Sequence, residues 1–170
     1  MCGIIGIASN KPVSINIINS LKKLEYRGYD SAGLATLTSK EINEKKCSGR
    51  VEELEKILFK KPSDGNIGIG HVRWATHGSP NLMNAHPHSS EIVSVVHNGI
   101  IENSDEIKKD LESKGLKFKS QTDTEVITLL ITEALKNIEP LAAVFETIKK
   151  LKGSFALGII FKDFNDMIIG

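Results

Sequence analysis

The chain has 170 residues, 40% of them hydrophobic, which is enough for one domain with its own core. Its 22 basic and 21 acidic side chains nearly balance, so charge gives no case for a nucleic-acid or anionic-membrane partner. The absence of a long apolar run or a signal-like segment, together with only two cysteines, Cys2 and Cys47, predicts a cytoplasmic protein without a disulfide framework.

The predicted elements alternate along the chain. Short apolar, β-branched runs predict strands, and apolar residues at helical spacing between cap signals predict helices. Strands are expected at 2–8, 32–38, 67–71, 92–97, 155–161 and 167–169, with a further one allowed before residue 51. Helices are expected from residues 15, 51, 103, 126 and 140, and Gly28, Gly115 and Gly153 are expected to end three of them. This order predicts an α+β domain in which helices cover sheets.

Cys2 stands directly behind the start methionine. Removal of Met1 would leave it as the first residue, with a thiol and a free α-amine together. The thiolate is the nucleophilic form of cysteine, and an α-amine that titrates near pH ~7.7–8.0 can accept the proton. One residue would then supply both nucleophile and base. The alternative is a buried cysteine at the start of the first strand.

Residues 71–78 read His-Val-Arg-Trp-Ala-Thr-His-Gly and are expected to carry a strand out into a loop. This loop would present Arg73, Trp74, Thr76 and His77 together. Arginine grips a carboxylate through two parallel hydrogen bonds, which makes Arg73 a candidate ligand for such a group. A surface loop with one structural tryptophan is the alternative.

Three further motifs carry polar groups with two interpretations each. His86 and His88 could ligate zinc, although no acidic or cysteine partner stands at regular spacing nearby. Asn98 and Gly99 follow an apolar strand and form either a hairpin turn or an oxyanion hole made of a side-chain amide and a backbone N–H. Asp123 lies in the capping-box sequence Thr-Asp-Thr-Glu and is either a helix cap or a carboxylate that holds an ammonium group.

Together these groups suit one kind of substrate. They offer a thiol nucleophile, an amine base, an oxyanion hole, an arginine for a carboxylate and an aspartate for an ammonium group. Glutamine carries an α-carboxylate, an α-ammonium and a reactive side-chain amide. A nucleotide loop does not compete, since Gly3 and Gly6 lie in an apolar run without the Lys-Ser/Thr of a phosphate loop.

Six motifs also match a known family in the same order along the chain. They lie at 1–6, 25–33, 70–78, 84–88, 96–103 and 122–127. With them the chain resembles the glutaminase domains of glutamine–fructose-6-phosphate aminotransferases, which are class-II amidotransferases. Amidophosphoribosyltransferases typically read Arg-Gly-Gln and Arg-Tyr-x-Thr where this chain has Arg-Gly-Tyr-Asp and Arg-Trp-Ala-Thr-His.

The resemblance implies an N-terminal nucleophile fold, a four-layer αββα sandwich, with Cys2 as the mature first residue. It implies that Arg73 binds the α-carboxylate of glutamine and that Asp123 binds its α-ammonium. Asn98 and the N–H of Gly99 would form the oxyanion hole.

The resemblance also assigns supporting roles. Trp74, Thr76 and His77 would belong to a loop that closes over glutamine, and His86 and Arg27 would lie close to the site. No metal or organic cofactor is implied.

The resemblance spans the chain, but the family's glutaminase domain continues with further strands and is followed by a sugar-isomerase half. Residues 1–170 are therefore expected to form a glutaminase domain that is incomplete at its C-terminus, without the sugar-isomerase domains. The expected reaction is hydrolysis of the glutamine amide, and a full-length, homo-oligomeric enzyme would pass the ammonia to fructose 6-phosphate, giving glucosamine 6-phosphate. The alternatives are the glutaminase of another amidotransferase, an N-terminal cysteine hydrolase for another amide, and an inactive fragment that only associates with other subunits.

Overall fold

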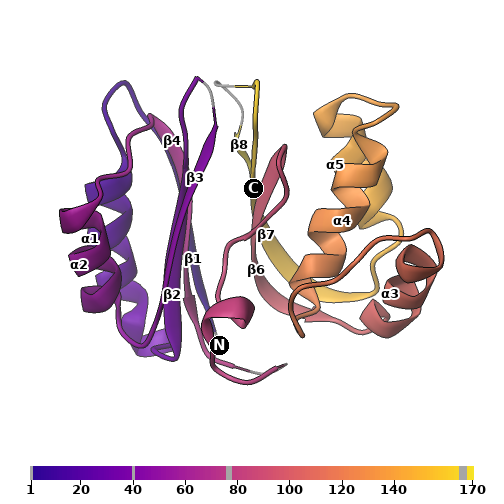
Figure 1. The fold of residues 1–170 in the computed structure, drawn as a ribbon, viewed down its shortest axis with the longest axis horizontal. Coiled ribbons are helices and arrows are strands. Elements are labelled where there is room, and N and C mark those ends of the chain that lie inside the picture. The colour runs from indigo at the N-terminus through magenta and orange to yellow at the C-terminus, as the bar shows by residue number, and fades with distance from the viewer. Residues whose placement is uncertain (1, 40, 76–77, 165–167) are drawn as a thin grey trace.

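The computed structural model describes residues 2–39, 41–75, 78–164 and 168–170, and it has four layers (Figure 1). Two four-stranded sheets face each other in the middle. Helices α1 (Ser14–Leu24) and α2 (Val51–Lys60) cover the outer face of the first sheet. Helices α3 (Ser104–Ser113), α4 (Thr124–Ala134) and α5 (Pro140–Ile148) lie outside the second. This arrangement confirms the expected αββα sandwich.

Within each sheet, all neighbouring strands are antiparallel. The first sheet has the order β1-β4-β2-β3, with β1 at Gly3–Ala8, β4 at Ile67–Arg73, β2 at Ser31–Leu37 and β3 at Ile42–Ser48. The second has the order β5-β6-β7-β8, with β5 at His88–Ser89, β6 at Val93–Ile101, β7 at Gly153–Phe161 and β8 at Ile168–Ile169. Short 3₁₀ helices occupy Glu25–Arg27 and Leu82–Asn84.

Most predicted elements are confirmed, and the differences lie at their ends. β4 and β6 run on to Arg73 and Ile101, because each is paired with a neighbour along its whole length. The further strand allowed before residue 51 is present as β3, whereas the two-residue β5 was not predicted. Of the last predicted strand, 167–169, the structure describes Ile168 and Ile169, which form β8, and Met167 lies outside the described residues.

Two predicted helix caps are wrong. Asn103 does not cap α3 through its side chain; its amide donates to the carbonyl oxygen of Lys150 and accepts the N–H of Lys152, at 2.9 and 2.8 Å. The capping box at 122–125 does not form either. Glu125 instead accepts the backbone N–H groups of Lys119 and Ser120, at 2.8 and 2.6 Å. Both side chains tie a neighbouring segment to the helix start, which a local pattern does not reveal.

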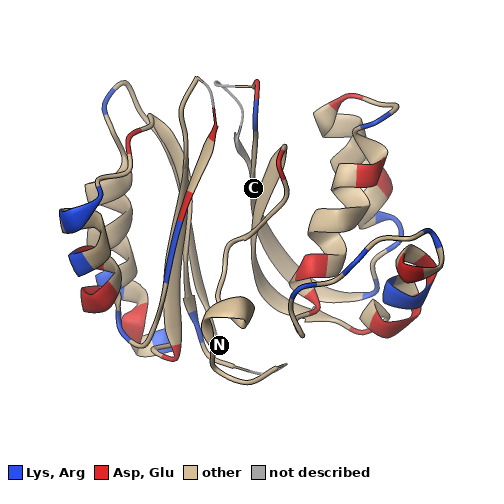
Figure 2. Ribbon diagram, in the orientation of Figure 1, with Lys and Arg blue, Asp and Glu red and all other residues tan. Residues whose placement is uncertain are grey.

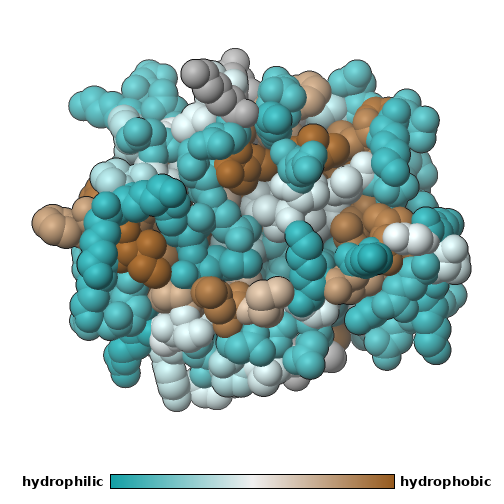
Figure 3. Space-filling view, viewed as in Figure 1, coloured by the Kyte–Doolittle hydropathy of each residue, from teal (hydrophilic) through white to brown (hydrophobic). Residues whose placement is uncertain are grey.

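The core consists of three apolar clusters, one in each gap between layers. The cluster between the two sheets is the smallest and contains Ala35, Leu37, Ile67, Ile69, Val96 and Ile160. The outer two lie under α1 and α2 on one side and under α3, α4 and α5 on the other. Charged residues of both signs are spread over the outer helices (Figure 2), and hydrophilic residues cover most of the surface in the same view (Figure 3). In the described part of the chain, no helix combines the length and hydrophobicity needed to cross a bilayer.

Candidate active site

The antiparallel register of β1 and β4 sets Cys2 beside Arg73. Gly3 pairs with Val72, so the residue before β1 lies next to the last residue of β4. The Sγ of Cys2 accepts the backbone N–H of Trp74 at 3.4 Å and lies 3.6 Å from the carbonyl oxygen of Trp74. Cys2 is therefore held against the backbone at the point where β4 leaves the sheet.

The thiol of Cys2 is partly buried, and this burial raises its pKa. The hydrogen bond from Trp74 and the positive charge of Arg73 oppose the shift without cancelling it. Because the thiolate is the reactive form, the site needs a base close to Cys2. Met1, whose removal would free the α-amine of Cys2, lies outside the described residues.

Arg73 is almost fully buried, with 3% of its surface exposed. Its guanidinium donates to the backbone carbonyl oxygens of Gly78 and Ser79, each at 3.3 Å, which fixes its planar head. Burial lowers the pKa of Arg73, while the nearby acidic groups of Cys2, Asp30 and Asp123 favour its charged form. The site thus contains a fixed cation close to the thiol.

Two residues of the 25–33 motif support this corner of the site. The carboxylate of Asp30 accepts the N–H of Ala75 at 2.7 Å, and its own N–H donates to the carbonyl oxygen of Arg73 at 3.0 Å. Gly28 packs on the same backbone, where a Cβ would lie only 2.5 Å from the carbonyl carbon of Arg73. Asp30 was not identified from the sequence, because a single carboxylate before a strand carries no signal of its partner.

Asn98 and Gly99 lie inside β6, which rules out the hairpin turn. Asn98 pairs with Ala156 and Gly99 with Phe155 on β7. Gly99 has a φ of +148° and approaches β7 so closely that a Cβ would lie 2.2 Å from the carbonyl oxygen of Ser154. Glycine is required here because a side chain at this φ and this distance would be strained.

Asp123 precedes α4 but does not cap it. Its Oδ2 accepts the N–H of Ile101 on β6 at 2.9 Å, and its Oδ1 lies 3.8 Å from Nδ1 of His97. The carboxylate is therefore turned from its own helix toward the second sheet.

These groups meet around one small cavity of about 20 Å³, with room for about one water molecule. Its lining consists of Cys2, Arg73, Trp74, His86, His97, Gly99, Thr122, Asp123 and Thr124. Of the predicted site residues that the structure describes, Asn98 and Arg27 are not part of this lining; Arg27 donates to the phenol oxygen of Tyr26 at 3.0 Å. The predicted loop residues Thr76 and His77 lie outside the described residues. His97, Thr122 and Thr124 were missed as lining residues.

The histidines at 86 and 88 are buried and bound to threonines. Nε2 of His86 lies 2.7 Å from Oγ1 of Thr124, and Nε2 of His88 lies 2.9 Å from Oγ1 of Thr122. Burial lowers the pKa of both rings, to about 3 for His88 and well below the usual range for His86. No three His, Cys, Asp or Glu side chains in the described part of the chain gather to hold a metal ion, which leaves the zinc alternative without support.

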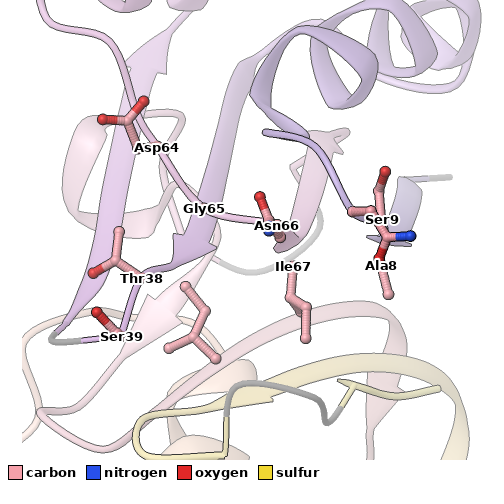
Figure 4. Close-up of a pocket in the computed structure, with 10 residues that line it drawn as sticks. Ala8, Ser9, Thr38, Ser39, Asp64, Gly65, Asn66 and Ile67 are labelled. Carbon is pink, nitrogen blue, oxygen red and sulfur yellow. The ribbon is translucent and has the colours of Figure 1, made fainter.

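A much larger hollow, of about 910 Å³, lies at the opposite end of the first sheet (Figure 4). It is formed where β1 and β2 end and β4 begins, by residues that include Ser9, Thr38, Asp64 and Asn66. Among the described residues that line it, none is a cysteine, histidine or arginine. The chemically equipped site is therefore the small cavity at Cys2.

Comparisons with known proteins agree with this geometry. A family model described as a glutamine amidotransferase domain matches residues 76–170. The chain is 50% identical over 171 residues to a glutamine–fructose-6-phosphate aminotransferase [isomerizing] of Mesorhizobium japonicum, and 49% identical to one of Bradyrhizobium diazoefficiens. Each match covers 100% of this chain and 28% of the relative, so the chain spans less than a third of their length.

Solved structures show the same fold. The glutamine phosphoribosylpyrophosphate amidotransferase of B. subtilis, complexed with ADP and GMP, superposes with a TM-score of 0.83 at 25% identity over 95% of this chain and 35% of its own. A glutamine aminotransferase class-II domain protein from Silicibacter pomeroyi shares the fold at a TM-score of 0.62 and 14% identity, over 94% of this chain and 72% of its own. The chain belongs to the glutamine amidotransferase family, and it matches the glutaminase part of its longer relatives.

Proposed function

We propose that this chain hydrolyses the side-chain amide of glutamine, with Cys2 as the nucleophile. The observation that carries the proposal is that Cys2, Arg73, Gly99 and Asp123 line one cavity. They come from one end of the first sheet, from β6 of the second sheet and from the residue before α4. In this proposal, Arg73 binds the α-carboxylate, Asp123 binds the α-ammonium, and the amide of Asn98 and the N–H of Gly99 receive the oxyanion.

The reaction has two halves. The thiolate of Cys2 attacks the side-chain carbonyl carbon, and the carbonyl electron pair moves to the oxygen. Collapse of the tetrahedral intermediate breaks the C–N bond, and ammonia leaves with a proton from the base. Water then attacks the glutamyl thioester, which releases glutamate and returns the thiol.

We propose that the base is the α-amine of Cys2, freed by removal of Met1. Burial raises the pKa of the thiol, so a proton acceptor is needed near neutral pH. A free α-amine titrates at about 7.7–8.0 and is attached to the same residue. Burial lowers the pKa of His86, which also lines the cavity, so this ring is a poor proton acceptor, and its Nε2 already contacts Thr124.

We propose that the ammonia is destined for fructose 6-phosphate in a longer, oligomeric protein of which residues 1–170 are the glutaminase domain. The support is the name and the length of the relatives, since each is an isomerizing fructose-6-phosphate aminotransferase and the match covers 28% of it. A cytoplasmic location is proposed as well, because both cysteines are free thiols.

The test compares two cysteines of the same chain. Cys2→Ala should abolish ammonia release from glutamine, and Cys2→Ser should be almost as inactive, since a hydroxyl is much harder to deprotonate. Cys47→Ala is the matched control, because Cys47 is buried in the apolar cluster beneath α1 and α2. This variant should stay active. Mass spectrometry before and after reaction with an electrophilic glutamine analogue reports Met1 removal and the alkylated residue. Full activity in protein that retains Met1 would refute the α-amine base.

A further inference from the structure

Thr124, the first residue of α4, sits at the centre of a buried polar cluster beside the candidate active site. It is fully buried, and its Oγ1 lies 2.7 Å from Nε2 of His86 and 2.9 Å from Nδ1 of His97. The two rings come from different places: His97 is on β6, and His86 precedes β5. One hydroxyl therefore joins a helix, a strand and a loop.

The chemistry of this contact is specific to a hydroxyl group. The hydroxyl of Thr124 has one O–H hydrogen and two lone pairs, so it can donate to one ring nitrogen and accept an N–H from the other. Burial lowers the pKa of His86, which keeps this ring neutral and able to serve as donor or acceptor. A valine of the same shape could do neither and would leave both buried nitrogens without this partner.

His71 closes the cluster on its far side. Its ring stacks on that of His86, with centroids 4.1 Å apart, and its Nε2–H donates to the carbonyl oxygen of His97 at 3.0 Å. The contacts thus run from β4 through the rings of His71 and His86 to Thr124, and back to β6 at His97. The strand that ends in Arg73 and the strand that contains Gly99 are both tied to the start of α4.

The neighbour of Thr124 in the chain is Asp123, the proposed ligand of the α-ammonium group. The Oδ1 of Asp123 lies 3.8 Å from Nδ1 of His97, the same nitrogen that contacts Thr124. His97 is held in β6 by its pairing with Leu157 on β7. Because β6 is fixed along its whole length by its pairing with β7, the part that can shift when the Thr124 contact is lost is the start of α4, with Asp123.

We propose that Thr124 is a positioning residue, which holds Asp123 at the right distance from the oxyanion strand by binding His86 and His97. It acts on the ammonium end of glutamine and does not touch the reacting amide. The proposal rests on the glutamine site proposed above.

The test compares three variants. Thr124→Val keeps the shape and removes the hydroxyl, whereas Thr124→Ser restores the hydroxyl. Thr128→Val is the matched control: Thr128 is also buried, one turn further along α4, and its hydroxyl lies within hydrogen-bond distance of the carbonyl oxygens of His88 and Thr124. If Thr124→Val does not fold, Thr124→Ala removes the hydroxyl without a methyl group against the two rings.

Two measurements separate positioning from packing. The first is kcat and KM for glutamine, and the second is the inhibition constant of glutaramate, which is glutamine without its α-amine. Thr124→Val should raise KM about tenfold with a smaller change in kcat, since the loss of a buried hydrogen bond has about that effect on an equilibrium. The inhibition constant of glutaramate should stay within about twofold of wild type, because this ligand has no ammonium group for Asp123. Thr124→Ser should have a KM close to that of the wild type, and Thr128→Val should leave KM unchanged.

Four results would overturn the inference. Equal weakening of glutamine and glutaramate by Thr124→Val would make Thr124 a packing residue, as would failure of Thr124→Ser to recover binding. Wild-type kinetics in Thr124→Val would remove its role while leaving the proposed function intact. If the wild-type protein releases no ammonia from glutamine and its Cys2 is unreactive, both the proposed function and this inference are overturned.

Discussion

Three of the buried histidines should make the stability of this protein strongly dependent on pH. Burial lowers the pKa of His71 and of His88 to about 3, and holds that of His86 well below the usual range. In the unfolded chain each ring is exposed to water and titrates near about 6.5. Below that value the unfolded chain takes up a proton at each ring, whereas in the folded chain His71 and His88 stay neutral down to about pH 3, and burial also keeps the pKa of His86 well below its usual range.

The sign and the size of the effect follow from this difference in bound protons. Stability is fully present above about pH 6.5 and falls as the pH decreases toward the folded-state pKa values. At about pH 5 each histidine has lowered the free energy of unfolding by ~2 kcal/mol, since one pH unit corresponds to ~1.4 kcal/mol per proton. Three histidines give ~6 kcal/mol, which is comparable with the whole stability of ~5–15 kcal/mol of a typical domain.

Urea unfolding between about pH 7.5 and pH 5 measures this loss directly. The slope of the unfolding free energy against pH should approach three protons, and His88→Asn should lower it by one. The range lies above the ordinary pKa values of Asp and Glu, so carboxylates contribute little to the slope. A loss of less than ~2 kcal/mol over this range, or an unchanged slope in His88→Asn, would show that the rings are not held neutral as described.

Three further substitutions test other parts of the site. Arg73→Lys keeps the charge but loses the two-pronged geometry, and kcat/KM for glutamine should fall roughly ten- to a hundredfold in a steady-state ammonia assay; a normal value would show that the carboxylate contact is misassigned. Asn98→Ala should lower kcat by ~10²–10³ with little change in the dissociation constant of glutamine, and the reverse pattern would make Asn98 a substrate-binding residue. Gly28→Ala places a Cβ 2.5 Å from the carbonyl carbon of Arg73 and should destabilise the fold by ~1–3 kcal/mol in urea unfolding, whereas an unchanged midpoint would mean that the loop moves aside freely.

The sequence alone predicted the types and order of most elements and the chemical groups of the site. Hydrophobic periodicity is a local property, so β1, α1 and β2 could be identified from their own residues. The polar strand β3 was weakly indicated, because it lies at a sheet edge and five of its seven residues are only half-buried. The two-residue β5 is too short to produce a pattern of its own.

Tertiary structure decided which meaning each ambiguous motif has. Asn98 and Gly99 could have formed a turn, and only their pairing with β7 keeps them in a strand. The sequence around Asp123 has the form of a helix cap, but its carboxylate accepts the N–H of Ile101 on β6 instead. The contacts of Thr124 with two histidines had no sequence signal, because these partners are 38 and 27 residues away and meet it only when the second sheet packs against α4. A local pattern specifies which hydrogen-bonding groups are present, and the packing of distant elements determines which of them become partners.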